Sequence, residues 1–264
     1  MIGAIYGDIV GSVYEFNNIK TKSFELFTDK NYFTDDTVMS IATAAALLEH
    51  DNAVDELGAF KETLIDKMHE IGNLYPNCGY GGHFSEWLDM NRREAYNSYG
   101  NGSAMRVSPV VWYGKTLEEV ENLATATAEI THNHPEGVKG AVVTAGAAFL
   151  AKNGHTKAEI KEYIEKYYDI SFTVDGIRPT YRFDVTCQGS VPQALVCFLE
   201  SVSFEDAIRN CISIGGDCDT TAAICGAVAQ GFYGMNEEQM NKAFSYLDDR
   251  LLSIVLNFKN KYMC

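Results

Sequence analysis

The chain has 264 residues, 46% of them apolar and 22% charged, which excludes a disordered or low-complexity protein. Its formal net charge of −15 argues against nucleic acid and anionic membranes as partners, because their phosphates repel such a chain. No run of about 18–20 apolar residues predicts a membrane span. The N-terminus lacks the basic region of a signal peptide, and the seven cysteines, Cys264 included, show no CxxC spacing. We therefore expect a cytoplasmic protein with reduced thiols.

Helical patterns begin at the N-terminus. Asp8 and Glu15 stand seven residues apart, so a helix through this segment would place both on one face. Two interpretations are open: solvated acids on a surface helix, or buried acids that need a cation or several hydrogen-bond donors.

Further helices are predicted along the rest of the chain. Segments rich in Ala and Gly and apolar on all sides predict interior helices over 37–49, 138–151 and 220–231. Amphipathic stripes predict helices over 57–68, over 117–130 and from Thr156 onward. Thr116 and Glu119 form a capping-box pattern at the start of the second of these.

Strand signals are few. The short segments 171–174 and 181–185 flank a turn-like stretch, and they predict either a small hairpin or a loop. No alternation of strands and helices occurs, so a doubly wound sheet is not expected. No proline- or serine-rich linker divides the chain. The sequence therefore predicts a single all-α domain over residues 1–264.

Paired acids precede two of the interior helices. One pair is Asp35 and Asp36, flanked by threonines; the other is Asp217 and Asp219, followed by Thr220. Helix capping explains one acid at each start, but not two. If the two helices pack together, four aspartates share one pocket, and their mutual repulsion requires cations. Oxygen ligands without His or Cys favour Mg²⁺, Mn²⁺ or Ca²⁺ over zinc, and so dense a cluster favours two ions over one.

Other segments suggest a ligand site. The turn Gly100-Asn101-Gly102-Ser103 opens an apolar segment, where backbone N–H groups could bind an anion such as a phosphate. An ordinary glycine turn is the alternative. His132 lies at a helix junction and could donate to a phosphate, or be a turn histidine with an internal partner. The glycine-rich turn 79–82 could form one wall of a cleft, whereas Trp87 is expected in the core.

Five segments together resemble the ADP-ribosylglycohydrolase family, which includes bacterial dinitrogenase-reductase-activating glycohydrolases. The matching segments are GDIVGSVYEF, FTDDTVM, YGNGSAMRVSPV, THNHPEGVKGA and GGDCDTTAAICGAVAQG, in this order across most of the chain. The resemblance implies a compact orthogonal bundle of helices with a binuclear Mg²⁺ or Mn²⁺ centre at the bottom of an ADP-ribose cleft. No motif of the family matches residues 168–188, so substrate specificity could lie there or around 75–83.

The resemblance also implies a role for particular residues. The metal ligands would be Thr34, Asp35, Asp36, Asp217, Asp219 and Thr220. The substrate-binding residues would be Gly100, Asn101, Gly102 and Ser103, around the diphosphate, with His132 beside them. The candidate catalytic acids are Glu15, Asp36 and Asp217.

The implied reaction is metal-dependent hydrolysis of the glycosidic bond between ADP-ribose and a modified side chain. The partner would be an ADP-ribosylated protein or an ADP-ribose derivative, and arginine is the expected acceptor. Alternatives within the class are serine-linked ADP-ribose and O-acetyl-ADP-ribose. Two other classes are open: a non-catalytic ADP-ribose-binding protein, and a metal-dependent phosphohydrolase that releases phosphate or AMP.

Overall fold

The computed structural model describes residues 1–263, and Cys264 lies outside this part. The predicted all-α class is confirmed: the described residues contain no strand, and one isolated antiparallel bridge pairs Gly100 with Thr186. The helices are α1 (Ile2–Gly11), α2 (Asp35–Leu48), α3 (Leu57–Gly72), α4 (Gly82–Asp89), α5 (Gly102–Met105), α6 (Val110–Tyr113), α7 (Leu117–Glu129), α8 (Pro135–Lys152), α9 (Lys157–Ile164), α10 (Val174–Ile177), α11 (Cys187–Leu199), α12 (Phe204–Ile214), α13 (Cys218–Tyr233), α14 (Glu237–Phe244) and α15 (Asp249–Tyr262).

The predicted helices are present, and N-cap side chains mark the starts of α2, α7, α8 and α9. The interior helices α2, α8 and α13 begin two or three residues earlier than their apolar patterns do. Capping boxes start α7 at Thr116 and α9 at Thr156. The segment around 171–185 is a loop that contains the short helix α10, which Thr173 caps by accepting from the N–H of Gly176. It does not form a hairpin.

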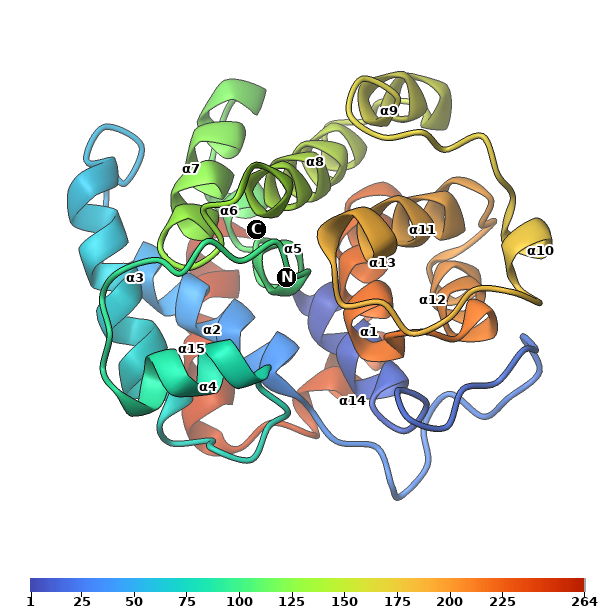
Figure 1. Cartoon of the computed structure of the whole chain (residues 1–264), viewed down its shortest axis with the longest axis horizontal. Helices are drawn as coiled ribbons and strands as arrows, with labels where there is room; N and C mark the ends of the chain where they lie inside the picture. The colour runs from blue at the N-terminus through green and yellow to red at the C-terminus, as the bar shows by residue number, and fades with distance from the viewer. Residues whose placement is uncertain (264) are drawn as a thin grey trace.

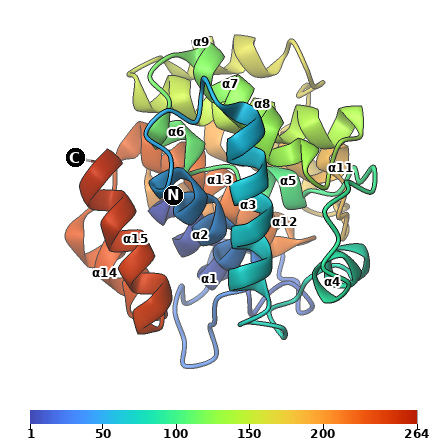
Figure 2. The same cartoon turned by 90° about the vertical axis from the view of Figure 1, so that its left-hand side faces the viewer.

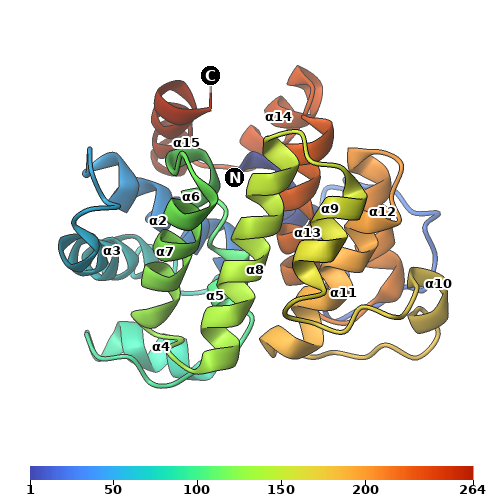
Figure 3. The same ribbon diagram turned by 90° about the horizontal axis from the view of Figure 1, so that it is seen from above.

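Helix α13 lies at the centre of the molecule. It packs against α1, α8, α11 and α12, and Figure 1 shows α1 and α13 side by side. Helix α2 packs against α3, which lies on the outside in Figure 2. Seen from above, α8 runs between the group of α2, α3 and α7 and the group of α9 to α12 (Figure 3). In the described part of the chain, no helix combines the length and the apolar character needed to cross a membrane.

Small residues bring α1 and α13 into backbone contact. A Cβ atom on Gly7 would lie 2.1 Å from the carbonyl oxygen of Ala222, and one on Gly11 would lie 2.4 Å from Cα of Asp219. A side chain at either position would push the helices apart. This contact places the end of α1 beside the acids at the start of α13.

The expectation that Asp8 and Glu15 share a helix face is wrong. Helix α1 ends at Gly11, so Asp8 is inside the helix while Glu15 lies in the turn that follows it. The interpretation as two solvated acids is also wrong, because Asp8 is fully buried and Glu15 is partly buried. The apolar pattern continues through Val13 and therefore does not reveal where the helix ends.

Candidate active site

A cavity of about 390 Å³ opens where the starts of α2 and α13 meet the turn after α1. Its size is that of a small-molecule site. Six residues of the two helix starts and this turn line it: Glu15, Asp35, Asp36, Asp217, Asp219 and Thr220. The structure thus brings the four paired aspartates to one cavity, together with Glu15.

Asp8 stabilises the start of α2 next to the cavity. Its carboxylate accepts hydrogen bonds from the Thr34 hydroxyl (2.7 Å), the Thr34 N–H (2.9 Å) and the Thr37 N–H (3.1 Å). Thr34 also caps α2 by accepting from the N–H of Asp36. The Thr34 hydroxyl is therefore used inside the protein, and Thr34 is not among the residues that line the cavity. Its role as a metal ligand remains a prediction.

Asp8 is a residue of the site that sequence reasoning did not select. The available signal was an acid inside an otherwise apolar N-terminal segment, because a buried carboxylate needs several donors. Those donors come from the chain 26 and 29 residues later. Their position could not be read from local spacing.

Two glycines shape the start of α13. Gly215 and Gly216 have φ values of +69° and +80°, which favour glycine, and they turn the chain so that Asp217 takes the N-cap position. Asp219 follows in the first turn and accepts from the N–H of Thr220 at 2.9 Å. The Thr220 hydroxyl donates across the cavity to Oδ2 of Asp36 at 3.1 Å. This bond connects the two helix starts.

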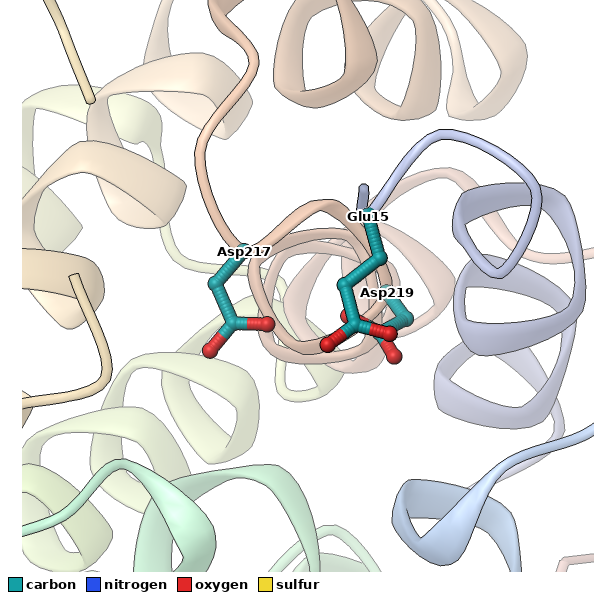
Figure 4. A group of neighbouring side chains, drawn as sticks. All are labelled: Glu15, Asp217 and Asp219. Atoms are coloured by element: carbon teal, nitrogen blue, oxygen red, sulfur yellow. The ribbon is translucent and has the colours of Figure 1, made fainter. Parts of the chain in front are cut away.

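Three acids converge most closely. Carboxylate oxygens of Glu15, Asp217 and Asp219 all lie within 4.8 Å of one another, and Figure 4 shows the side chains pointing to a common point. Burial, followed by the charges of Asp219 and Asp8, raises the pKa of Glu15 to about 8. Burial raises the pKa of Asp217 to about 6.

The pKa values of the remaining aspartates are shifted in the same direction. Burial and the charge of Asp219 raise the pKa of Asp35 and of Asp36 well above the usual value, and burial with the charge of Asp217 does the same for Asp219. Without a counter-charge, the cluster therefore binds protons far more tightly than isolated carboxyls do.

The donor set fits a hard divalent cation. Oδ1 of Asp36 is buried and has no hydrogen-bond partner among the described residues, although a buried carboxylate oxygen normally has one. The groups around it are carboxylate and hydroxyl oxygens, the ligands that Mg²⁺, Mn²⁺ and Ca²⁺ prefer. The cluster could therefore hold a metal ion.

The glycine turn borders the acids and is tied to them. Asn101 donates from Nδ2 to Asp217 (2.7 Å) and to Ser190 (3.0 Å), and its N–H donates to the carbonyl of Val185. Gly100, Asn101 and Gly102 line the cavity. Ser103 does not: its side chain is fully buried and its hydroxyl donates to the carbonyl of Gly137 at 2.7 Å.

His132 and several aromatic side chains complete the walls. His132 lines the cavity although it is only 5% exposed. The turn at 79–82 contributes Gly79, Gly81 and Gly82 to the lining, as the sequence predicted, while Trp87 is fully buried in the core. The lining residues that sequence reasoning did not select include Phe84, Tyr96, Arg106, Phe183 and Val185. The last two belong to the segment 168–188, for which no motif was found.

An aromatic pair lies at the mouth of the cavity. The rings of Phe16 and Phe183 stack with centroids 6.1 Å apart and planes at 27°. Both are exposed, Phe16 by 76% and Phe183 by 48%, which is unusual for phenylalanine. Phe16 follows Glu15 directly in the chain, so the pair adjoins the acid cluster.

Comparisons with known proteins agree with this architecture. The model of the ADP-ribosylglycohydrolase family matches residues 1–237. The human ADP-ribosylhydrolase ARH3 is 26% identical over 90% of this chain and 85% of its own length. The ADP-ribosyl-[dinitrogen reductase] glycohydrolase of Rhodospirillum rubrum is 26% identical over 89% of this chain and 85% of its own length. A solved structure, titled ADP-ribosylglycohydrolase-related protein complex, shares the fold with a TM-score of 0.71 at 19% identity, over 98% of this chain and 96% of that one. The chain therefore belongs to the ADP-ribosylglycohydrolase family, and it is a glycosidase that acts on linkages to ADP-ribose.

Proposed function

We propose that this protein removes ADP-ribose from arginine side chains of modified proteins, with two divalent cations, Mg²⁺ or Mn²⁺, in the acid cluster. The observation that carries the proposal is the convergence of five carboxylates at one end of a cavity whose other walls are a glycine turn, a histidine and aromatic rings. The cations would be held by Asp35, Asp36, Asp217, Asp219 and the hydroxyl of Thr220, with Thr34 as a further ligand.

The aspartates suit cleavage of a glycosidic bond. Such cleavage passes through an oxocarbenium-like transition state, whose positive charge nearby carboxylates stabilise. Divalent cations, when bound, would fix the ribose hydroxyls and lower the pKa of a water molecule. Asn101 donates to Asp217 and Thr220 donates to Asp36, so these two side chains keep the carboxylates oriented toward the cavity.

Glu15 is the acid suited to moving a proton. Burial raises the pKa of its carboxyl in the metal-free cluster, and in its protonated form the carboxyl can donate to the leaving nitrogen of the acceptor. The carboxylate that results can then accept a proton from the attacking water. Glu15 lies in a turn outside any helix, is partly buried and lines the cavity, where a bound substrate would lie.

The aromatic pair at the mouth supports arginine as the acceptor. A guanidinium group is planar and cationic, so it stacks on aromatic faces and pairs with carboxylates. Phe183 lines the cavity beside Glu15, and both rings are accessible. A serine acceptor has no group that would use these surfaces.

Product analysis by mass spectrometry tests the proposal. Purified protein is incubated with an ADP-ribosyl-arginine peptide in Mg²⁺, in Mn²⁺ and in EDTA, and the bound metal is counted by elemental analysis. We expect intact ADP-ribose in the presence of either ion, none in EDTA, and two ions per chain. Asp219→Asn should lose the activity while keeping the helical circular dichroism signal.

Parallel substrates identify which part of the proposal fails. Release from a serine-linked peptide or from O-acetyl-ADP-ribose alone would contradict the arginine acceptor. Phosphate or AMP as product would indicate a phosphohydrolase. Binding of ADP-ribose without any turnover would indicate a binding protein. Full activity in EDTA would contradict the role of the cations.

A further inference from the structure

Arg106 is a buried cation without an acidic partner. It is 1% exposed, and its Nη2 donates to the carbonyl of Thr127 (2.9 Å) and to the hydroxyl oxygen of Thr131 (2.7 Å). Within residues 1–263, no carboxylate forms a salt bridge with it. Its guanidinium carbon lies 5.8 Å from the ring centroid of Phe84. Burial of an unpaired charge is costly, so Arg106 is expected to have a role beyond packing.

Thr131 connects Arg106 to His132 by hydrogen bonds. Oγ1 of Thr131 lies 2.8 Å from Nδ1 of His132. A guanidinium group can only donate, so the oxygen of Thr131 must accept from Arg106. In the part of the chain that the structure describes, Nδ1 of His132 is the acceptor within reach of the Thr131 hydroxyl proton. The hydroxyl therefore donates to Nδ1, and a neutral His132 carries its own proton on Nε2.

Nε2 of His132 faces the glycine turn. A Cβ atom built on Gly102 would lie 3.1 Å from Nε2, and one built on Gly100 would lie 3.5 Å from it. The absence of side chains at these two positions thus leaves space in front of the N–H group. His132, Gly100 and Gly102 all line the cavity, so this donor points toward a ligand that occupies it.

We propose that Arg106 and Thr131 are positioning residues that fix His132 as an Nε2–H donor to a phosphate of the ADP-ribose group at the glycine turn. The identity of the ligand rests on the proposed function, whereas the position of the proton does not. Burial and the charge of Arg106 hold the pKa of His132 well below its usual value, which keeps the ring neutral. The ring then presents one defined donor.

Nuclear magnetic resonance of ¹⁵N-histidine-labelled protein tests the proton position without any ligand. The two ring nitrogens of His132 have distinct shifts according to which one is protonated. We expect wild type to show a protonated Nε2 and an unprotonated Nδ1. A proton on Nδ1 in wild type would overturn the proposal, and this measurement requires no variant to fold.

Three variants then test whether the hydrogen bonds from Arg106 through Thr131 position His132. Thr131→Val removes the hydroxyl at nearly constant volume, and Thr131→Ser retains it. Thr127→Val is the matched control, because it keeps the backbone carbonyl that accepts from Arg106, while its buried hydroxyl donates to the carbonyl of Ala124 and does not contact His132. Thr131→Val should give mixed ring protonation and about tenfold weaker binding of ADP-ribose by calorimetry, the value of one good hydrogen bond. Thr131→Ser and Thr127→Val should match wild type in both.

The outcomes separate this proposal from the function it rests on. Unchanged ring protonation and affinity in Thr131→Val would overturn the positioning role, as would an equal loss in Thr127→Val. If wild type shows the Nε2 proton but does not bind ADP-ribose, the proposed function fails, and with it the assignment of the ligand. The Nε2 tautomer would stand in that case.

Discussion

Asp36 illustrates the conflict between stability and function at the scale of one residue. One of its oxygens accepts from Thr220, and the other is buried without a partner. Burial and four neighbouring acids raise its pKa, so folding without a counter-ion favours its protonated form. Residues that serve a cation are expected to destabilise the cation-free protein.

Asp36→Asn should therefore stabilise the metal-depleted protein and abolish hydrolysis. We expect a gain of roughly 0.5–2 kcal/mol in the free energy of unfolding, because the amide removes one acid from the cluster. Urea unfolding in EDTA measures it, and product analysis in Mg²⁺ measures the activity. Asp29→Asn, at an exposed position, is the control and should change neither. A destabilised Asp36→Asn in EDTA would contradict repulsion among the acids.

The types of the site residues could be predicted from sequence better than their orientations. Two acids before each interior helix indicated the cluster, because capping accounts for only one of them. The pattern could not show that the Ser103 hydroxyl points into the protein, since that depends on the carbonyl of Gly137 on another helix. The same is true of Asp8, whose donors belong to a distant segment.

At the scale of elements, the contact between α1 and α13 depends on the absence of side chains. Gly7→Ala would place a methyl group 2.1 Å from the carbonyl oxygen of Ala222. We expect a loss of roughly 1–3 kcal/mol in the free energy of unfolding, the usual cost of overpacking. Gly58→Ala is the matched control, because Gly58 lies in α3 with no atom within 4 Å of the added Cβ.

The two alanine variants should differ in sign. Gly58→Ala should stabilise the protein by roughly 0.5–1 kcal/mol, through helix propensity and a less flexible unfolded chain. Thermal unfolding of the two variants beside wild type measures both effects. Stabilisation by Gly7→Ala would show that α1 and α13 separate without cost, which the close contact excludes.

The interior helices and three amphipathic helices were predicted, whereas α4, α11, α12, α14 and α15 were not, and helix ends were harder to predict. The capping box of Thr116 and Glu119 is local in sequence and was predicted, and the start of α9 near Thr156 was predicted from its apolar stripe. The end of α1 is not local: it is set by Gly11 against Asp219 and by the turn that carries Glu15. Helix α10 is one short turn that a period of 3.6 residues cannot reveal.

At the scale of the whole molecule, the acid cluster should dominate the pH dependence of stability. The pKa values of Asp8 and Asp217 rise to about 6 and that of Glu15 to about 8 in the folded protein. A carboxyl whose pKa rises on folding favours the folded state below its unfolded pKa, near 4. That contribution is lost as the pH rises through the folded values.

In EDTA, the melting temperature should therefore fall by several degrees between about pH 5 and pH 8. Mg²⁺ or Mn²⁺ should reduce this fall, because cations that bind the ionised cluster stabilise the folded state most where the carboxyls are charged. Differential scanning calorimetry at matched ionic strength measures both profiles. If the melting temperature falls equally with pH in the presence and absence of the ion, the prediction is wrong.

The hydrogen bond from Asn101 to Asp217 has a consequence for the energetics of the two ends of the cavity. The backbone N–H of the same asparagine donates to Val185, so one residue of the glycine turn contacts both Asp217 and the segment of Val185. A ligand that moves the turn thereby changes how Asp217 is held, and equilibria at the two positions are coupled. Such coupling is reciprocal. If a ligand at the glycine turn changes the affinity of Asp217 for a cation, the cation changes the affinity of the turn for that ligand by the same factor. Removal of the cation proposed at Asp217 should therefore change the affinity of the glycine turn for its ligand.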